Sequence, residues 1–305
     1  MAQELRTLET DQIRGHLTAQ YARVTFATSE GADATYDSTR VAYGVDLASR
    51  AWFGHELRTL PGDADLLPRL ERVRRDYDHL RHPHTGRLSS TRAVLAPGLA
   101  NQFLHYYLLQ NLSMLSILNG ASAFTVGDLE ENRRLFHPDL VISDAPVRND
   151  HPTAFRLDDR GQAPVARDLI HEGRLVGADV SLRAARQGGL DPSPTSLTGN
   201  WLLPTQPGTV TPAGGSDLAD CLEPMEDGVF IYSVLGLHTQ DASRGAYSLG
   251  VPRALVVRNG KIRGFVRGTL VGNFFDDLNA PLQVLSDPLA DKPILPILAS
   301  FTPSD

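Results

Sequence analysis

The sequence has very little cysteine and lysine. Among its 305 residues, Cys221 is the single cysteine, which excludes an intramolecular disulfide and is typical of a reducing, cytoplasmic environment. Lys261 and Lys292 are the only lysines among 29 basic residues. We attribute this arginine bias to codon usage in a GC-rich bacterial genome rather than to a functional arginine surface.

Other features that the sequence lacks exclude whole classes of protein. It has no run of about 18 apolar residues, so we expect no membrane-spanning helix. Its net charge of −7 argues against nucleic-acid binding, which usually needs a basic face. The glycine-rich signatures of dinucleotide and nucleoside-triphosphate sites are missing. The N-terminal residues mix charged and apolar positions, unlike a secretory signal.

The elements that the sequence does predict begin with a helix and a strand. Ile13, Leu17 and Tyr21 recur every four residues, which predicts a helix over residues 9–21. Residues 23–28 then have the composition of a strand.

The next segment completes a small N-terminal α/β lobe. Residues 46–57 predict a further strand, and an apolar stripe over residues 64–80 predicts an amphipathic helix. Residues 81–90 have the composition of a loop. We therefore expect two domains, over residues 1–87 and 88–305.

The second domain is expected to begin with a long buried helix. Residues 92–95 predict a short strand, and Pro97 can occupy the first turn of a helix, where its missing N–H costs nothing. Apolar side chains on most sides of that helix continue to Leu118. Asn119-Gly120 then predicts a left-handed cap.

Residues 135–300 predict a β-rich region, because short apolar runs alternate with turn signals. Asn259-Gly260 is the strongest hairpin signal, since both residues tolerate positive φ. Residues 187–216 predict a long, functional connection rich in Gly, Pro, Ser and Thr. The fold class predicted is α+β: a large, mostly antiparallel C-terminal sheet with a long buried helix, plus the small N-terminal lobe.

Several residues could carry chemistry, and each also has an ordinary structural interpretation. His82 and His84 share one loop and could bind a metal, but no carboxylate or cysteine lies beside them. His238, Asp241 and Ser243 have the residue types of a triad, although triad members usually come from distant positions.

Five segments, in their order along the chain, resemble the TldD/PmbA family over roughly residues 90–290. They are Ala93–Pro97, Phe155–Gly161, Leu169–Ala184, Thr198–Asn200 and Val256–Asn273. In this family, TldD subunits are zinc metallopeptidases, and PmbA subunits, also called TldE, are metal-free companions. The N-terminal 87 residues are shorter than the family's usual N-terminal domain.

The resemblance also implies where a zinc site would lie. TldD subunits bind zinc through two histidines of an H-E-x-x-x-H helix and a distant cysteine, and the glutamate activates water. An ungapped placement puts His105 on the first histidine, Tyr106 on the glutamate and Gln110 on the second histidine. Ile231 falls near the cysteine position and offers no lone pair. The resemblance therefore implies that this chain holds no metal and has no catalytic residue of its own.

The implied role is a TldE-like subunit that assembles with a TldD-like catalytic chain, which would hold the zinc. The substrates would be unfolded or modified peptides. One such reaction would be the removal of a leader peptide in natural-product biosynthesis. Two alternatives stay open: a stand-alone hydrolase with a relocated or metal-free site, and a peptide-binding protein. The candidate pocket or partner contacts are His105, Asp158, Thr198, Asn200 and His238.

Overall fold

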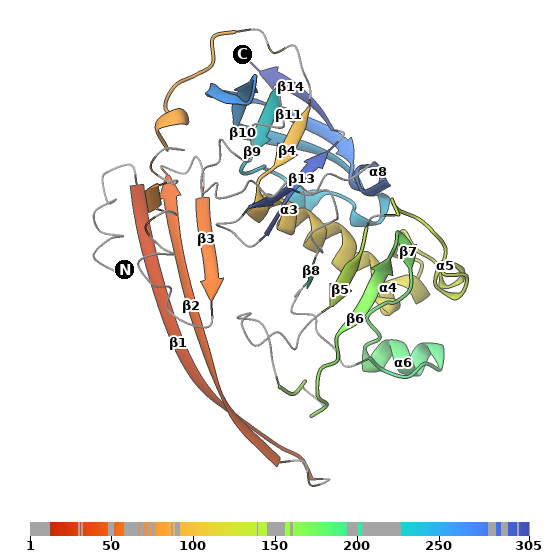
Figure 1. The fold of residues 1–305 in the computed structure, drawn as a ribbon. Helices are drawn as coiled ribbons and strands as arrows, with labels where there is room; N and C mark the ends of the chain where they lie inside the picture. The colour runs from red at the N-terminus through yellow and green to blue at the C-terminus, as the bar shows by residue number, and fades with distance from the viewer. Residues whose placement is uncertain are drawn as a thin grey trace.

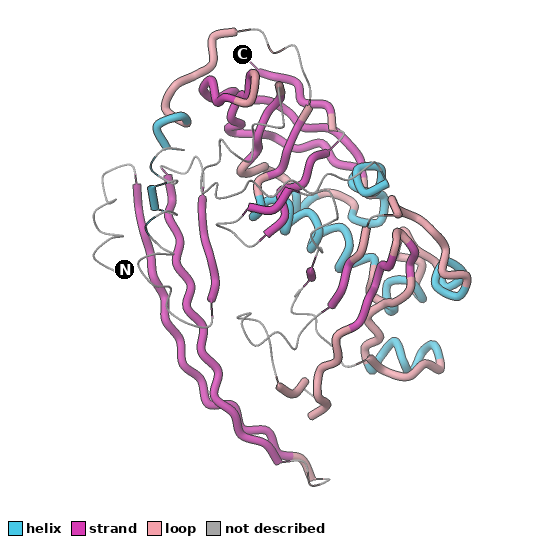
Figure 2. Tube along the Cα trace, in the orientation of Figure 1, coloured by secondary structure: helices cyan, strands magenta, loops and turns pink. Residues whose placement is uncertain are grey.

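The structure is a computed structural model, and it confirms the predicted α+β architecture with three sheets and several short helices (Figures 1 and 2). It describes residues 13–29, 31, 33–47, 52–57, 67, 70–71, 74, 77–86, 88, 92–138, 140–144, 156–158, 161–193, 201–202, 227–279, 285–287, 292–297 and 299–304.

The N-terminal sheet is an antiparallel hairpin with a third strand beside half of it. Strand β1 (Ile13–Ala27) pairs along its whole length with β2 (Asp33–Leu47). Strand β3 (Trp52–Leu57) pairs only with residues 41–46 of β2. Residues 33–40 of β2 and 20–27 of β1 therefore form a part of the sheet that has only two strands, and this part extends as a long curved hairpin (Figure 1).

The predicted helix over residues 9–21 is wrong, because residues 13–21 belong to β1. A spacing of four residues repeats on one face of a strand as well as of a helix, so Ile13, Leu17 and Tyr21 fit both. Pairing with β2, which the sequence did not predict, decides between them. Residues 9–12 lie outside the described residues. The strand predicted over residues 23–28 forms the second half of β1.

The amphipathic helix predicted over residues 64–80 is confirmed at the residues described there. Residues 67, 70, 71, 74 and 77–79 are helical. Leu70, Tyr77 and Leu80 are buried, whereas Glu71 and Arg74 are exposed.

Among the described residues, the C-terminal sheet has seven strands, and all neighbouring pairs are antiparallel except β4 with β9. This agrees with the mostly antiparallel sheet predicted. In spatial order its strands are β12 (Leu285–Asp287), β13 (Lys292–Ile297), β4 (Ala93–Leu95), β9 (Gly228–Ile231), β10 (Ala246–Arg258), β11 (Lys261–Asn273) and β14 (Ser300–Ser304).

The hairpin of β10 and β11 confirms the strongest turn prediction. Asn259 has a φ of 48° and Gly260 a φ of 66°, as a two-residue hairpin turn requires. The apolar run that indicated the first strand of this hairpin covers only residues 254–257, and β10 is longer because its first half alternates small residues with the buried side chains of Tyr247, Leu249 and Val251.

The loop before the C-terminal domain is tied to this sheet. His84 N donates to Phe265 O at 2.8 Å, and Phe265 N donates to His82 O at 2.9 Å. The segment around Pro83 therefore pairs with β11 beside β14. The domain boundary at residue 87 stays a prediction.

The long helix is present but interrupted. Helix α3 (Pro97–Phe103) continues into a π-helical turn, η1 (Leu104–Leu109), and the chain turns at Leu112 before α4 (Met114–Leu118) begins. Met114 N donates to Asp179 O, and Asp179 N donates to Leu112 O. This distant pairing breaks the predicted continuous helix. Gly120, with a φ of 67°, confirms the left-handed end.

A third, four-stranded sheet and three further short α-helices lie among the described residues. The sheet order is β7 (Arg174–Leu175), β6 (Arg167–His171), β5 (Ile142–Asp144) and β8 (Trp201–Leu202); the helices are α5 (Val126–Glu130), α6 (Leu182–Gly188) and α8 (Phe274–Asn279). The long connection predicted over residues 187–216 therefore contains the end of α6 and strand β8, and residues 194–200 and 203–216 lie outside the described residues.

The main core lies between the C-terminal sheet and the interrupted helix. Phe103 and Tyr107 are fully buried and contact the rings of Tyr247 and Phe274 at centroid distances of 5.2–6.3 Å. Tyr247 donates a hydrogen bond of 2.8 Å to the buried carboxylate of Asp277. Burial first, and the charge of Asp277 second, raise the pKa of Tyr247 above its usual range. This cluster holds η1 rigidly against the sheet.

Candidate functional site

The π-helical turn η1 lies where the zinc-binding helix motif was placed. In an α-helix, residues five apart point about 140° away from each other, given 3.6 residues per turn. In a π-helical turn, with its i to i+5 hydrogen bonds, such residues lie nearly above one another. His105 and Gln110 have this spacing, and η1 covers Leu104–Leu109. The local backbone thus has the form that an H-E-x-x-x-H pair would need.

The side chains at these positions do not form a zinc-binding set. His105 is half-buried and Gln110 is exposed, so the second position offers only an amide. Ile231 lies on β9 with none of its surface exposed and has no donor atom. Zinc sites in proteins use three or four Cys, His, Asp or Glu donors. The residues placed on this motif therefore do not fit a zinc ion.

Tyr106, which the resemblance places on the glutamate, is bound to a neighbouring loop. Its hydroxyl donates to the main-chain oxygen of Gln240 at 2.5 Å. The hydroxyl proton of Tyr106 is therefore used in a structural hydrogen bond between η1 and the loop that follows β9.

Two more side chains of the same helix hold that loop. Asn111 is 1% exposed, and its amide donates to Ala242 O at 2.8 Å and to Tyr107 O at 2.6 Å. The hydroxyl of Tyr107 donates to Ala246 O at 3.3 Å. Tyr106, Tyr107 and Asn111 together fix residues 240–246 against the helix. Sequence reasoning missed Asn111 and Gln240; the signal available was an asparagine within an apolar helical stripe.

Ile231 lies in the C-terminal sheet, next to the start of helix α3. It pairs with Leu95 on β4 and with Ala254 on β10, and its carbonyl accepts a hydrogen bond of 2.8 Å from Ala96 N. Pro97 begins α3 directly afterwards. The position placed on the distant cysteine is therefore in the sheet core, at the base of the helix that carries His105.

The remaining candidate contacts have different surroundings. Asp158 is buried, and its carboxylate accepts a 2.8 Å hydrogen bond from Gln162 N, so this carboxylate stabilises a turn. His238 is exposed in a single helical turn, η3 (Leu237–Thr239), of the loop that Tyr106 contacts. Thr198 and Asn200 lie outside the described residues.

The triad-like residues near His238 form a local cap instead. The carboxylate of Asp241 accepts hydrogen bonds from Ser243 Oγ at 2.6 Å and from Ser243 N at 3.0 Å. The Ser243 hydroxyl holds the pKa of Asp241 below its usual range. A serine whose proton is donated to a carboxylate is not activated by a histidine base. These contacts start the helical turn η4 (Ala242–Arg244).

A second set of these residue types lies on the four-stranded sheet. Asp168 accepts from Ser143 Oγ at 2.5 Å and contacts His171 Nδ1 at 2.9 Å. The carboxylate stands between the serine and the histidine, whereas a triad places the histidine in the middle. This order does not support nucleophilic catalysis.

In the histidine pair His82 and His84, one ring nitrogen of His84 contacts a main-chain oxygen and the other is buried without a hydrogen-bond partner. His84 Nδ1 is 3.2 Å from Arg263 O, and its Nε2 is buried beside Gly86, where an added Cβ would lie only 2.8 Å away. Neither ring nitrogen of His84 is presented for a metal shared with His82. Within the parts of the chain that the structure describes, no three His, Cys, Asp or Glu side chains are grouped to hold a metal ion.

No helix among the described residues is long and apolar enough to cross a membrane.

Comparisons with known proteins agree with the fold. The chain resembles a crystal structure of a candidate modulator of DNA gyrase from Thermotoga maritima, with 19% identity and a TM-score of 0.75, over 94% of this chain and 68% of that one. A similarly named protein from Bacteroides thetaiotaomicron gives 17% identity and a TM-score of 0.74, over 98% and 70%. TldE from Thermococcus kodakarensis gives 14% identity and a TM-score of 0.72, over 94% and 68%.

A search of curated proteins gave no match. Residues 89–296, more than half of the chain, match the sequence model of the PmbA/TldA metallopeptidase C-terminal domain. The chain therefore belongs to the PmbA/TldD metallopeptidase family.

Proposed function

We propose that this chain is the non-catalytic, TldE-like subunit of a heteromeric zinc metallopeptidase. The observation that carries the proposal is the contact of Tyr106 with Gln240 O, together with the full burial of Ile231. Tyr106 has a phenol, which is already hydrogen-bonded, in place of a carboxylate base. Ile231 has a hydrocarbon side chain in place of a thiolate. A metallopeptidase needs both a metal held by converging donors and a base for its water.

The companion in this proposal is a TldD-like chain with an intact H-E-x-x-x-H helix and the cysteine. It supplies the zinc, and the present chain supplies the wall formed by η1 and residues 236–246. On that wall, His238 is exposed and His105, in η1, is half-buried. Both are proposed as contacts for an unfolded peptide or for the companion, in a reducing cytoplasm that suits a single cysteine. Leader removal from a small modified peptide is one substrate class that this assembly would serve.

The test is co-expression with the companion, encoded in the same genome, followed by peptide digestion. Each chain alone and the mixture are incubated with an unfolded peptide, and the fragments are measured by mass spectrometry. We expect cleavage by the mixture and none by this chain. Full-rate cleavage by this chain alone contradicts the proposal.

A matched pair of variants sharpens this test. His105→Ala in this chain should leave the zinc content of the complex unchanged, because the proposal gives His105 no metal. Substituting the first motif histidine of the companion should remove the zinc. A loss of zinc with His105→Ala would mean that this side chain binds the metal.

A further inference from the structure

The outer half of the β1–β2 hairpin differs from its base. Strand β3 pairs with β2 only from Val41 to Asp46, so residues 20–27 of β1 and 33–40 of β2 have no third strand among the described residues. The burial of β2 changes at the same place, because Val41 is 6% exposed whereas Arg40, directly before it, is exposed. We call residues 20–27 and 33–40 the arm.

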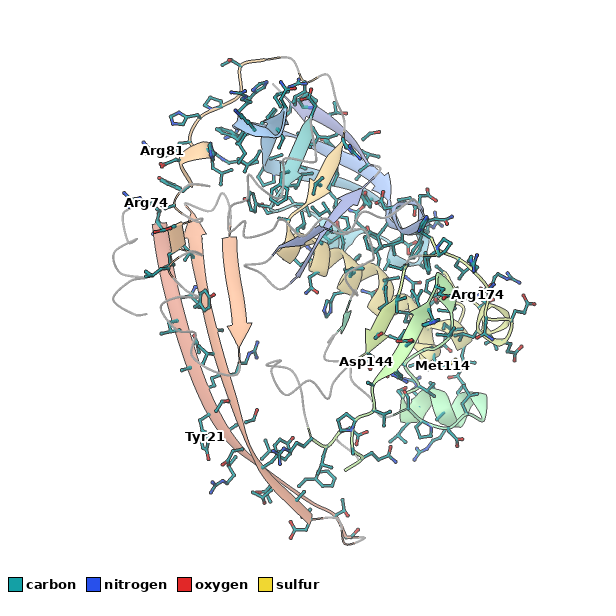
Figure 3. The ribbon with its side chains drawn as sticks, viewed as in Figure 1. Tyr21, Arg74, Arg81, Met114, Asp144 and Arg174 are labelled. Carbon is teal, nitrogen blue, oxygen red and sulfur yellow. The ribbon has the colours of Figure 1, made fainter. Side chains whose placement is uncertain are left out.

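One face of the arm is polar and open to solvent. On this outer face, Arg23 forms an ion pair of 2.8 Å with Asp37. The hydroxyls of Thr25 and Thr35 lie 3.2 Å apart across the two strands, and all four residues are exposed. Tyr21, on the same face, is 63% exposed (Figure 3). The outer face thus satisfies its polar groups by contacts within the hairpin and with water.

The opposite face of the arm is apolar and half-buried. Residues that lie directly opposite each other in an antiparallel pair share one face. Val24 lies opposite Tyr36, and Phe26 lies opposite Ala34. All four are half-buried, whereas the residues of the outer face are exposed. Strand pairs with one polar and one apolar face bury the apolar one. The inner face is therefore directed toward another part of the chain.

Phe26 identifies that part as the turn before β6. Its ring lies against Gly161, where an added Cβ would be only 2.5 Å from Cε1 and 2.9 Å from Cζ of the ring. Gly161 also has a φ of 75°, which favours glycine. Figure 1 shows the hairpin running away from the end of β3 toward residues 156–161. Glycine at this position is therefore needed both for the backbone conformation and for the approach of the ring.

The turn under the ring is fixed by its own hydrogen bonds. Asp158 is 6% exposed, and its carboxylate accepts from Gln162 N at 2.8 Å. Asp158 N donates to Gln162 O at 2.9 Å, and Gly161 N donates to Asp158 O at 3.0 Å. The arm has less support, because a two-stranded hairpin is only marginally stable in water. A weakly supported arm thus rests on a well-fixed turn.

We propose that the arm is a strap that opens and closes on the turn before β6, with the ring of Phe26 on Gly161 as its latch. The structure shows the closed state. The hinge lies between Arg40 and Val41, where the sheet changes from two strands to three. Local opening needs little free energy where few apolar side chains are buried, and a half-buried ring is a weak latch. The strap involves this chain alone and is independent of the function proposed above.

Pulsed electron spin resonance between two spin labels measures the opening. The labels are attached to cysteines introduced at Asp33 on the strap and at Ala163 after the turn, both exposed, in a chain with Cys221→Ser. The labelled chain should show one main distance. Phe26→Ala should add a second population that is longer by on the order of 10 Å, because the strap is about 26 Å long at about 3.3 Å per residue. Thr25→Ala, on the outer face, is the control and should keep the single distance.

Two glycine variants test the latch from the other side. Gly161→Ala places a methyl group where the ring lies, so it should open the strap as Phe26→Ala does. Gly120→Ala is the matched control, because Gly120 has a similar φ of 67° but no atom within 4 Å of its added Cβ. It introduces the same backbone strain and should leave the distance unchanged. In the Phe26→Ala chain, Gly161→Ala should cause no further opening.

Each result supports the strap or overturns it. A second, longer distance in Phe26→Ala and Gly161→Ala, but not in Thr25→Ala or Gly120→Ala, supports it. Circular dichroism shows whether each variant is folded, and a folded Phe26→Ala chain with the unchanged distance overturns the strap. Equal opening by the two glycine variants also overturns it, because backbone strain and not the ring would then be the cause. If either Phe26→Ala or Gly161→Ala does not fold, the other variant decides alone.

Discussion

Tyr106 on η1 and Gln240 in the loop after β9 are joined by a hydrogen bond of 2.5 Å, from the phenol hydroxyl to the main-chain oxygen. In the proposed function, this contact stands where the catalytic subunits of the family place a glutamate that activates water. The helix has a π-helical turn at this place, and the side chain of Tyr106 makes a structural contact. The loop that carries His238 is thereby fixed to the helix that carries His105.

Removing that hydroxyl should loosen the loop. Tyr106→Phe leaves Gln240 O without this donor, which should lower the free energy of unfolding by about 1 kcal/mol. Chemical denaturation measures the change. Tyr36→Phe, at a half-buried tyrosine of β2, is the control and should stay within about 0.5 kcal/mol of the wild type. Equal effects of the two variants would mean that the hydroxyl of Tyr106 contributes nothing specific.

Glu172 and Asn259 are the first central residues of two hairpin turns, and both have positive φ. Substitutions at these two residues should have opposite effects on stability. Glu172 has a φ of 49° in the turn between β6 and β7, a conformation that asparagine tolerates better than glutamate. Glu172→Asn should therefore stabilise the chain by about 0.5 kcal/mol. Asn259→Ala, at a φ of 48°, should destabilise it by a similar or larger amount. Thermal unfolding of both variants checks this, and two shifts of the same sign would contradict it.

The free energy of unfolding should fall at acidic pH, in part because the carboxylate of Asp227 becomes protonated. The hydrogen bond from Asn259 N, and then Arg258 at 2.6 Å, holds the pKa of Asp227 below its usual range. A carboxylate with a lowered folded-state pKa stabilises the protein above its unfolded pKa of about 3.9 and loses this contribution as pH falls through the folded value.

The measurement is the melting temperature of Asp227→Asn between pH 6 and pH 3. The variant should be less stable than the wild type near pH 6, and the difference should shrink below about pH 4. Asp191→Asn, at an exposed residue after α6, serves as the control. A difference between Asp227→Asn and the wild type that does not change with pH would contradict the assignment.

If the scaffold of a zinc site is kept, its ligands can be restored. A variant with Tyr106→Glu, Gln110→His and Ile231→Cys provides, together with His105, the donor set of the family's catalytic subunits. We expect it to bind about one zinc ion per chain, since two imidazoles and a thiolate are a common zinc-binding set. The same variant with His105→Ala should bind far less. Equal zinc content in both would mean that the four positions do not converge.

The features that could be predicted from the sequence are those set by local chemistry. Asn259-Gly260 fixes its own turn, because few other residues adopt positive φ there. Pro97 and Gly120 mark the start and the end of the helical region for the same kind of local reason.

The features that could not be predicted depend on distant partners. β1 is a strand because β2 pairs with it, although its apolar spacing fits a helix equally well. The helix stops at Leu112 because Asp179, more than 60 residues later, pairs with residues 112 and 114. The partner of Tyr106 is a main-chain oxygen, which no sequence pattern reveals.

The most direct test of the central claim is the zinc content of the wild-type chain, purified alone after growth with added zinc. Inductively coupled plasma mass spectrometry gives the molar ratio of zinc to protein after dialysis against metal-free buffer. The account predicts a ratio near zero for this chain. A ratio near one that falls to zero in His105→Ala would contradict it, because this helix would then still hold a metal.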